Sequence, residues 1–115
     1  MQREQLVGSV GMACLTVRPL DTGVAQGLND LPVLVANSAL NVIESACSAA
    51  IAEHFETGET SFTIGAAIQM RGAVSIGAEV RALVKATELA ENVLTFECEV
   101  HQEQRIIAVA QVQRR

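Results

Sequence analysis

The sequence holds one long segment with a clean helical pattern, Asn37-Ser-Ala-Leu-Asn-Val-Ile-Glu-Ser-Ala-Cys-Ser-Ala-Ala-Ile-Ala-Glu-His-Phe55. Asn37 or Ser38 is predicted to cap its start, because either side chain can accept a hydrogen bond from a free backbone N–H of the first turn. At about 100° per residue, one side of this helix collects Ala39, Leu40, Ile43, Cys47, Ala50, Ile51 and Phe55. Glu44 falls inside this apolar arc, where a carboxylate is costly unless it is paired or used.

After residue 60 the hydrophobic pattern changes to a period of two, which is typical of an antiparallel sheet with one covered face. The expected strands are Leu6–Arg18 before the helix and Phe62–Met70, Ala78–Thr87, Val93–His101 and Arg105–Gln113 after it. The expected connections are a loop at Asp21–Asn29, an extended lead at Leu31–Val35, a helix exit at Glu56–Glu59 that includes Gly58, and turns at Ser75–Gly77, Glu88–Asn92 and His101–Gln104. The order β-α-β-β-β-β predicts one α+β domain over residues 1–115, with a central helix of small residues wrapped by a sheet of about five strands.

Composition limits the classes of partner. Half of the 115 residues are hydrophobic, which is enough for one core, and the net charge of −5 with few aromatic residues argues against nucleic-acid binding. No apolar run approaches the ~18 residues that span a bilayer, so no membrane partner is expected. The three cysteines are far apart and form no Cys-x-x-Cys motif, so we expect each to be a small buried side chain in a protein of the cytoplasm, with no metal site.

Four segments together resemble the fluoroacetyl-CoA-thioesterase-like branch of the hotdog superfamily. They are Leu31-Pro-Val-Leu-Val-Ala-Asn-Ser-Ala-Leu-Asn-Val-Ile-Glu-Ser-Ala-Cys47, Gly58-Glu-Thr-Ser61, Gly77-Ala-Glu-Val80 and Leu94-Thr-Phe-Glu-Cys-Glu-Val-His101. The similarity runs in register over about residues 31–113. It implies a hotdog fold and an acyl-CoA or related thioester as substrate. It implies no cofactor other than the coenzyme A of the substrate.

The resemblance carries a catalytic pattern that this chain keeps only in part. Members of the branch place a Thr near the helix start, a Glu eight residues later and a His on the strand after the helix. Glu44 matches the Glu, but Ala36 stands at the Thr position and Met70 at the His position. By this likeness Ala36, Met70, Arg71 and Gly72 are expected to line the substrate site.

Two functional hypotheses follow. In the first, Glu44 is the base or nucleophile of a thioesterase, Asn37 and Ser38 contribute polar groups, and free N–H groups around Asn37–Leu40 stabilise the oxyanion. In the second, the protein binds an acyl thioester or another small apolar ligand without catalysis, and Glu44 is a structural acid. A third hypothesis is a dehydratase on the same fold. The two histidines, His54 and His101, are poorly placed for that reaction.

Other polar residues have simple structural interpretations. His54 suits a helix C-terminus, His101 a strand end, and Gln69 points away from Met70 unless the strand slips by one residue. Gly72 marks a bulge or a close backbone approach. The basic side chains that could meet coenzyme A phosphates are Arg71, Arg81, Lys85 and Arg105, although scattered strand charges usually form a solvated face.

The likeness also implies a homodimer or a higher oligomer, with sheets joined edge to edge. Two observations agree: an open sheet has edge strands to cover, and Val93, Ile107 and Val109 are expected on the face opposite the core.

Overall fold

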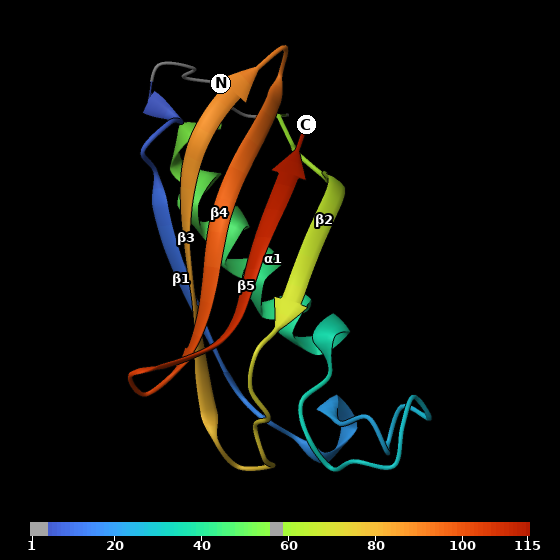
Figure 1. Cartoon of the computed structure of the whole chain (residues 1–115). Coiled ribbons are helices and arrows are strands. Elements are labelled where there is room, and N and C mark those ends of the chain that lie inside the picture. Colours follow the sequence, from blue (N-terminus) through green and yellow to red (C-terminus); the bar gives the residue numbers. More distant parts are fainter. Residues whose placement is uncertain (1–4, 56–58) are drawn as a thin grey trace.

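One helix packs on one antiparallel sheet. The computed structural model describes residues 5–55 and 59–115, and within these ranges five strands form the sheet (Figure 1). They are β1 (Val10–Thr16), β2 (Thr63–Met70), β3 (Glu79–Ala90), β4 (Val93–Gln102) and β5 (Arg105–Arg114). Their order across the sheet is β1-β3-β4-β5-β2, so β1 and β2 are the edges. The predicted α+β architecture is confirmed, while the predicted helix exit with Gly58 lies outside the described residues.

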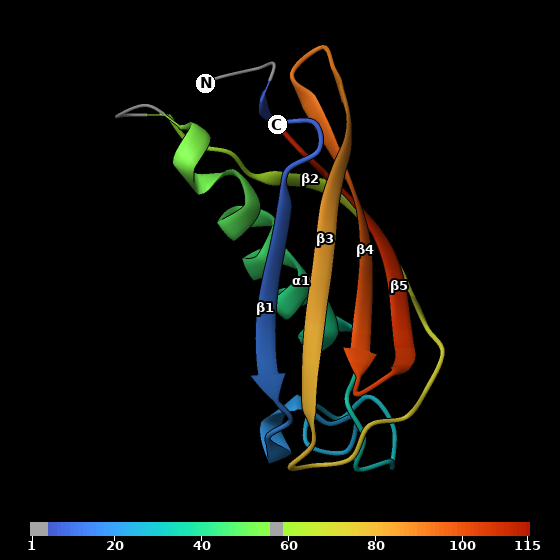
Figure 2. The ribbon, with the colours of Figure 1, turned by 90° about the vertical axis from the view of Figure 1, so that its left-hand side faces the viewer.

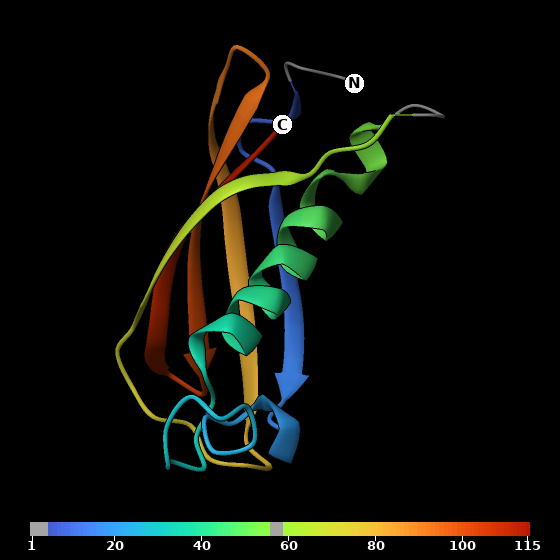
Figure 3. The same cartoon turned by 90° about the vertical axis from the view of Figure 1, so that its right-hand side faces the viewer.

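The helix α1 (Ala36–Ile51) continues as a short 3₁₀ turn over Ala52–His54. Figures 2 and 3 show that α1 covers one face of the sheet and leaves the other face without a helix. It packs mainly against β1 and β3. Its buried face is wider than the predicted arc, because Val42 and Ala46 also enter the core.

The helix begins earlier than predicted, and neither Asn37 nor Ser38 caps it. Val35 is the N-cap residue and makes no side-chain cap. The preceding segment is held extended by backbone bonds, with the Leu34 N–H donating to Val74 O at 2.9 Å and the Val35 N–H to Asp21 O at 3.0 Å. The first residue free to turn helical is therefore Ala36, which places Asn37 and Ser38 inside the first turn.

A β-bulge changes which residues of β5 enter the core. Val100 pairs with Ala108 but His101 pairs with Ile106, so Ile107 is an extra residue between two pairs. The prediction that Ile107 faces away from the core is wrong, because Ile107 is fully buried, whereas its neighbour Ile106 is 38% exposed. The extra residue in a bulge breaks the strict alternation from which the faces were assigned.

The strand β2 is less buried than the other strands after the helix, with four of its eight residues exposed and four partly buried. Ile68 and Met70 pack against the core, but Phe62 is 59% exposed and Ile64 is 45% exposed. The expected apolar face from Phe62 to Met70 is therefore buried only at its C-terminal end. As an edge strand, β2 curves past the helix (Figure 3) and has few contacts with it.

The cysteines separate into two environments. Cys47 of α1 and Cys98 of β4 are buried as expected, but Cys14 is exposed because it points away from the helix on the edge strand β1. The neighbouring Cys47 thiol and burial both raise the pKa of the Cys98 thiol. No described helix has the length and apolar character to cross a membrane.

Candidate active site

Glu44 lies about two turns into α1. Residues at i, i+4 and i+8 share a helix face, so Glu44 follows Ala36 and Leu40 along one stripe. Leu40 is half-buried against the core and Glu44 is half-buried as well. Within the described ranges, no hydrogen bond or ion pair holds the Glu44 carboxylate. A partly desolvated carboxylate without a fixed partner is available to accept a proton from a bound molecule.

The N-terminus of α1 offers free amide groups near this stripe. The Ala39 N–H already donates to Val35 O at 3.1 Å, and Leu40 lies in the regular part of the helix. The free donors are therefore those of Ala36, Asn37 and Ser38, which corrects the predicted range of Asn37–Leu40. Such N–H groups and the helix dipole favour negative charge at this end.

The side chains of Asn37 and Ser38 are tied to the loop before the helix. Asn37 Nδ2 donates to Gln26 Oε1 at 2.8 Å, and Gln26 Nε2 donates to Ser38 Oγ at 3.2 Å and to Leu20 O at 2.9 Å. Ser38 is buried and lies about 120° around the helix from Glu44. The structure thus does not bring the Ser38 hydroxyl and the Glu44 carboxylate together.

Ser38 instead belongs to a small polar hollow of about 180 Å³ between β1 and α1. On its wall, the buried carboxylate of Asp21 accepts three bonds from Arg18, from Nε at 2.9 Å, Nη2 at 3.0 Å and the backbone N–H at 2.9 Å. The Arg18 guanidinium holds the pKa of Asp21 below its usual value, with smaller contributions from the Arg18 N–H and the Ser38 hydroxyl. The sequence analysis did not predict this cluster. The only signal for it was an arginine and an aspartate of opposite charge, Arg18 and Asp21, placed on either side of Pro19.

We expect Asp21→Asn to lower the free energy of unfolding at pH 7 by about 1.5–3 kcal/mol, the contribution of hydrogen bonds to a charged group. A carboxyl with a lowered folded pKa stabilises the protein above its unfolded pKa of about 3.9, and this stabilisation is lost as the pH falls through the folded value. Urea unfolding at pH 7 and at lower pH should therefore show the gap between variant and wild type closing. Asp30→Asn, an exposed change in the same loop, is the control, and an equal gap at every pH would contradict the assignment.

The four residues expected to line the substrate site divide between two elements. Ala36 opens α1, and Met70, half-buried, ends β2. The N–H groups of Arg71 and Gly72 both donate to Ile107 O, at 2.7 and 3.2 Å. A Cβ on Gly72 would lie 3.2 Å from Arg105 Nη1 and 3.4 Å from Ile107 Cγ2, both of them side-chain atoms.

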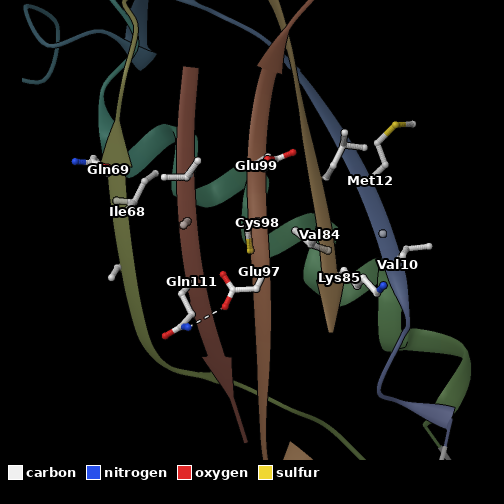
Figure 4. A pocket seen from close by; sticks show the side chains of 15 residues that line it. Val10, Met12, Ile68, Gln69, Val84, Lys85, Glu97, Cys98, Glu99 and Gln111 are labelled. Carbon is white, nitrogen blue, oxygen red and sulfur yellow. Dashed lines mark hydrogen bonds between the residues drawn. The ribbon is translucent and has the colours of Figure 1, made fainter. Parts of the chain in front are cut away.

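The remaining candidates lie apart from Glu44. His54 lies at the opposite end of the helix, where its Nε2 is 3.4 Å from Ser9 Oγ. His101 Nε2 is 3.1 Å from Oε1 of Glu99, which lies on the bare face, the face of the sheet that α1 does not cover. Gln69 and Lys85 also point to that bare face (Figure 4). The basic side chains are scattered: Arg81 donates to Glu103 O and Arg105 to Ala73 O, while Arg71 is exposed beyond β2.

Solved structures share this architecture. A mutant of the fluoroacetyl-CoA-specific thioesterase in complex with fluoroacetate and CoA matches with a TM-score of 0.84 and 20% identity, over 94% of this chain and 91% of that one. A Thermus thermophilus hypothetical protein of the thioesterase superfamily matches at 0.86 and 18%, over 94% and 80%. A hot-dog-like protein from Thermanaerovibrio acidaminovorans matches at 0.89 and 15%, over 99% and 86%. These likenesses confirm the hotdog fold.

Sequence comparison narrows the assignment within that fold. No curated protein sequence matches the chain significantly. The family model for the fluoroacetyl-CoA-specific thioesterase, in contrast, matches residues 17–115, which include the helix, four of the five strands and Glu44. The match confirms the resemblance inferred from the four sequence segments. This protein belongs to the fluoroacetyl-CoA-specific thioesterase family.

Proposed function

We propose that the protein hydrolyses a small acyl-CoA thioester with Glu44 as base or nucleophile. The observation that carries this proposal is the Glu44 carboxylate, half-buried on an apolar helix flank and without a partner among the described residues. A carboxylate that no other described side chain holds is free to contact a bound substrate. The family's name and the CoA held by a similar protein support CoA thioesters as the substrate class.

The proposed reaction uses two parts of one helix. The amide groups of Ala36–Ser38 polarise the thioester carbonyl and then stabilise its developing oxyanion. Glu44 removes a proton from water as the water oxygen attacks the carbonyl carbon, and the proton passes to the sulfur when the C–S bond breaks. If Glu44 is instead the nucleophile, its carboxylate oxygen attacks the carbonyl carbon, the C–S bond breaks and coenzyme A leaves as a thiolate that takes a proton from water. Water then cleaves the resulting acyl-enzyme anhydride, which releases the acid and restores the Glu44 carboxylate. Neither route needs a cofactor beyond the coenzyme A of the substrate.

A second function is favoured by two residues. Ala36 has no hydroxyl and Met70 no ionisable group at the positions where the family pattern has Thr and His. The protein would then bind an acyl thioester or another small apolar ligand without cleaving it, with Glu44 as a structural acid.

Thiol release from a panel of acyl-CoA esters of increasing acyl size separates these functions. A hydrolase turns over at least one member, and a binder turns over none but still binds a non-hydrolysable thioether analogue in calorimetry. An absence of both turnover and analogue binding would contradict both functions. The cytoplasm, where we propose that the protein acts, is consistent with three free cysteines among the described residues.

We further propose that two copies join through β2. Ile64 of this edge strand and Phe62, the residue just before it, are exposed. Among the described residues, β2 pairs only with β5, so its outer backbone groups have no strand neighbour there. Pairing β2 with the second copy's β2 would cover both and extend the sheet. Light scattering at micromolar concentration should give at least a dimer mass, and Ile64→Asp should halve it; a monomer mass for the wild type would refute the proposal.

A further inference from the structure

The first turn of α1 has no cap at its N-terminus. A Ser, Thr, Asn or Asp at the N-cap would accept a hydrogen bond from the N–H of the second or third helical residue, which here are Asn37 and Ser38. Val35 stands at the N-cap and has no side-chain oxygen to offer. Among the described residues, none accepts a hydrogen bond from either of these two N–H groups. Both groups are therefore open to a bound molecule.

A loop side chain holds this turn in another way. The Gln26 carboxamide bridges the two side chains: its Oε1 accepts a hydrogen bond from Asn37 Nδ2 at 2.8 Å, and its Nε2 donates to Ser38 Oγ at 3.2 Å. Nε2 also donates to Leu20 O at 2.9 Å. Gln26 thus ties the first turn of the helix to the loop through side chains and leaves the backbone N–H groups of the turn unoccupied.

Gln26 projects from a turn that is itself anchored. Its backbone N–H donates to Thr22 O at 3.1 Å. Thr22 is 1% exposed, its hydroxyl donates to Pro19 O at 2.7 Å, and it forms an antiparallel bridge with Leu34. Leu34 belongs to the extended segment that leads into α1. The loop therefore contacts the start of the helix twice, through this backbone bridge and through the Gln26 side chain.

We propose that Gln26 is a positioning residue for the thioester carbonyl. It holds Ala36–Ser38 in the helical conformation in place of a cap, so that the N–H groups of this turn are aligned and free. The inference rests on the proposed function, because these are the amides that would polarise the carbonyl. An ordinary N-cap would stabilise the same turn but would occupy one of them. Gln26 acts through Asn37 and Ser38 and does not itself contact the reacting atoms.

Gln26→Met tests the positioning role, because it keeps the length of the side chain but removes its three hydrogen bonds. The Ala39 N–H donates to Val35 O across the first turn, so its hydrogen exchange reports whether that turn is formed. We expect this exchange to rise about fivefold, the effect of losing a cap of ordinary strength. The kcat for thiol release should fall by a similar factor, with KM nearly unchanged. Gln104→Met, at an exposed position between β4 and β5, should alter neither quantity.

Val35→Thr separates positioning from simple stabilisation of the turn. Thr keeps the β-branched shape of Val, but its hydroxyl can accept a hydrogen bond from the N–H of Asn37 or Ser38. Added to Gln26→Met, it should restore slow exchange at Ala39 but not kcat, because the turn is formed again while one amide is occupied. Far-UV circular dichroism checks that each variant is folded.

Either of two results in Gln26→Met would overturn the proposal. Unchanged exchange at Ala39 would show that Gln26 does not hold the turn, and an unchanged kcat would show that holding the turn does not serve the reaction. Recovery of kcat on adding Val35→Thr would also overturn it, since a cap would then serve as well as Gln26. A wild type that cleaves no ester would refute the proposed function and the positioning role with it, whereas faster Ala39 exchange in Gln26→Met would still show that Gln26 holds the helix start.

Discussion

Glu44→Gln is expected to lower the rate of thiol release by about 10²–10⁴-fold, the range of a general acid–base group. Gln keeps the size of the side chain and its place one turn after Leu40 on the same helix stripe, but it cannot take a proton. If Glu44 acts as the nucleophile, the amide removes that route as well, so the direction of the effect is the same. The measurement is kcat and KM on whichever acyl-CoA ester of the panel wild type cleaves fastest.

The matched control is Glu53→Gln, an exposed carboxylate in the turn that follows α1. It makes the same chemical change at the other end of the helix and should leave kcat within twofold. Loss in kcat with an unchanged KM would place Glu44 in the transition state rather than in binding. If Glu44→Gln retains full activity while folded, the base lies elsewhere and the proposed mechanism fails.

The sequence predicted the framework because its signals were periodic. The inward positions of β3 and β4 alternate strictly, and every one from Val80 to Ala86 and from Leu94 to Val100 is buried. The predicted alternation failed at Ile107. A β-bulge depends on how two strands pair, so it cannot be seen in the hydrophobic period of a single strand. It also failed on β2, because the sequence does not show whether a strand lies at the edge of the sheet.

The sequence was sufficient to single out Glu44 as a candidate, but not to predict how the other polar groups are arranged around it. Glu44 stands out from sequence alone, as a carboxylate within an apolar arc. The separation of Ser38 from Glu44 depends on where the helix begins, and that is fixed by the bonds of Leu34 and Val35 to distant segments. The role of Gln26 depends on loop geometry, which no periodic pattern encodes.

Gly11→Ala is expected to lower the free energy of unfolding by about 3 kcal/mol, at the upper end of the cost of overpacking a core. A Cβ built on Gly11 would lie 2.2 Å from Ala46 O and 2.9 Å from Ala50 Cβ. The nearer atom is a backbone carbonyl within α1, so it cannot rotate away and the helix itself must move from β1. For a domain of this size the loss corresponds to a melting temperature lower by about 10–20 °C.

Gly65→Ala is the control, because it adds the same methyl group to a strand glycine whose nearest neighbour, Gln113 Oε1, would be 3.6 Å away. Ala is the better residue in a strand, so this variant should be as stable as wild type or slightly more so. Adding Ala50→Gly to Gly11→Ala should not restore stability, since it removes the contact with Ala50 Cβ but not the one with Ala46 O. Equal melting temperatures for the two glycine variants would show that α1 can shift without cost. The stripe that carries Glu44 would then be held less firmly than the close approach of helix and strand implies.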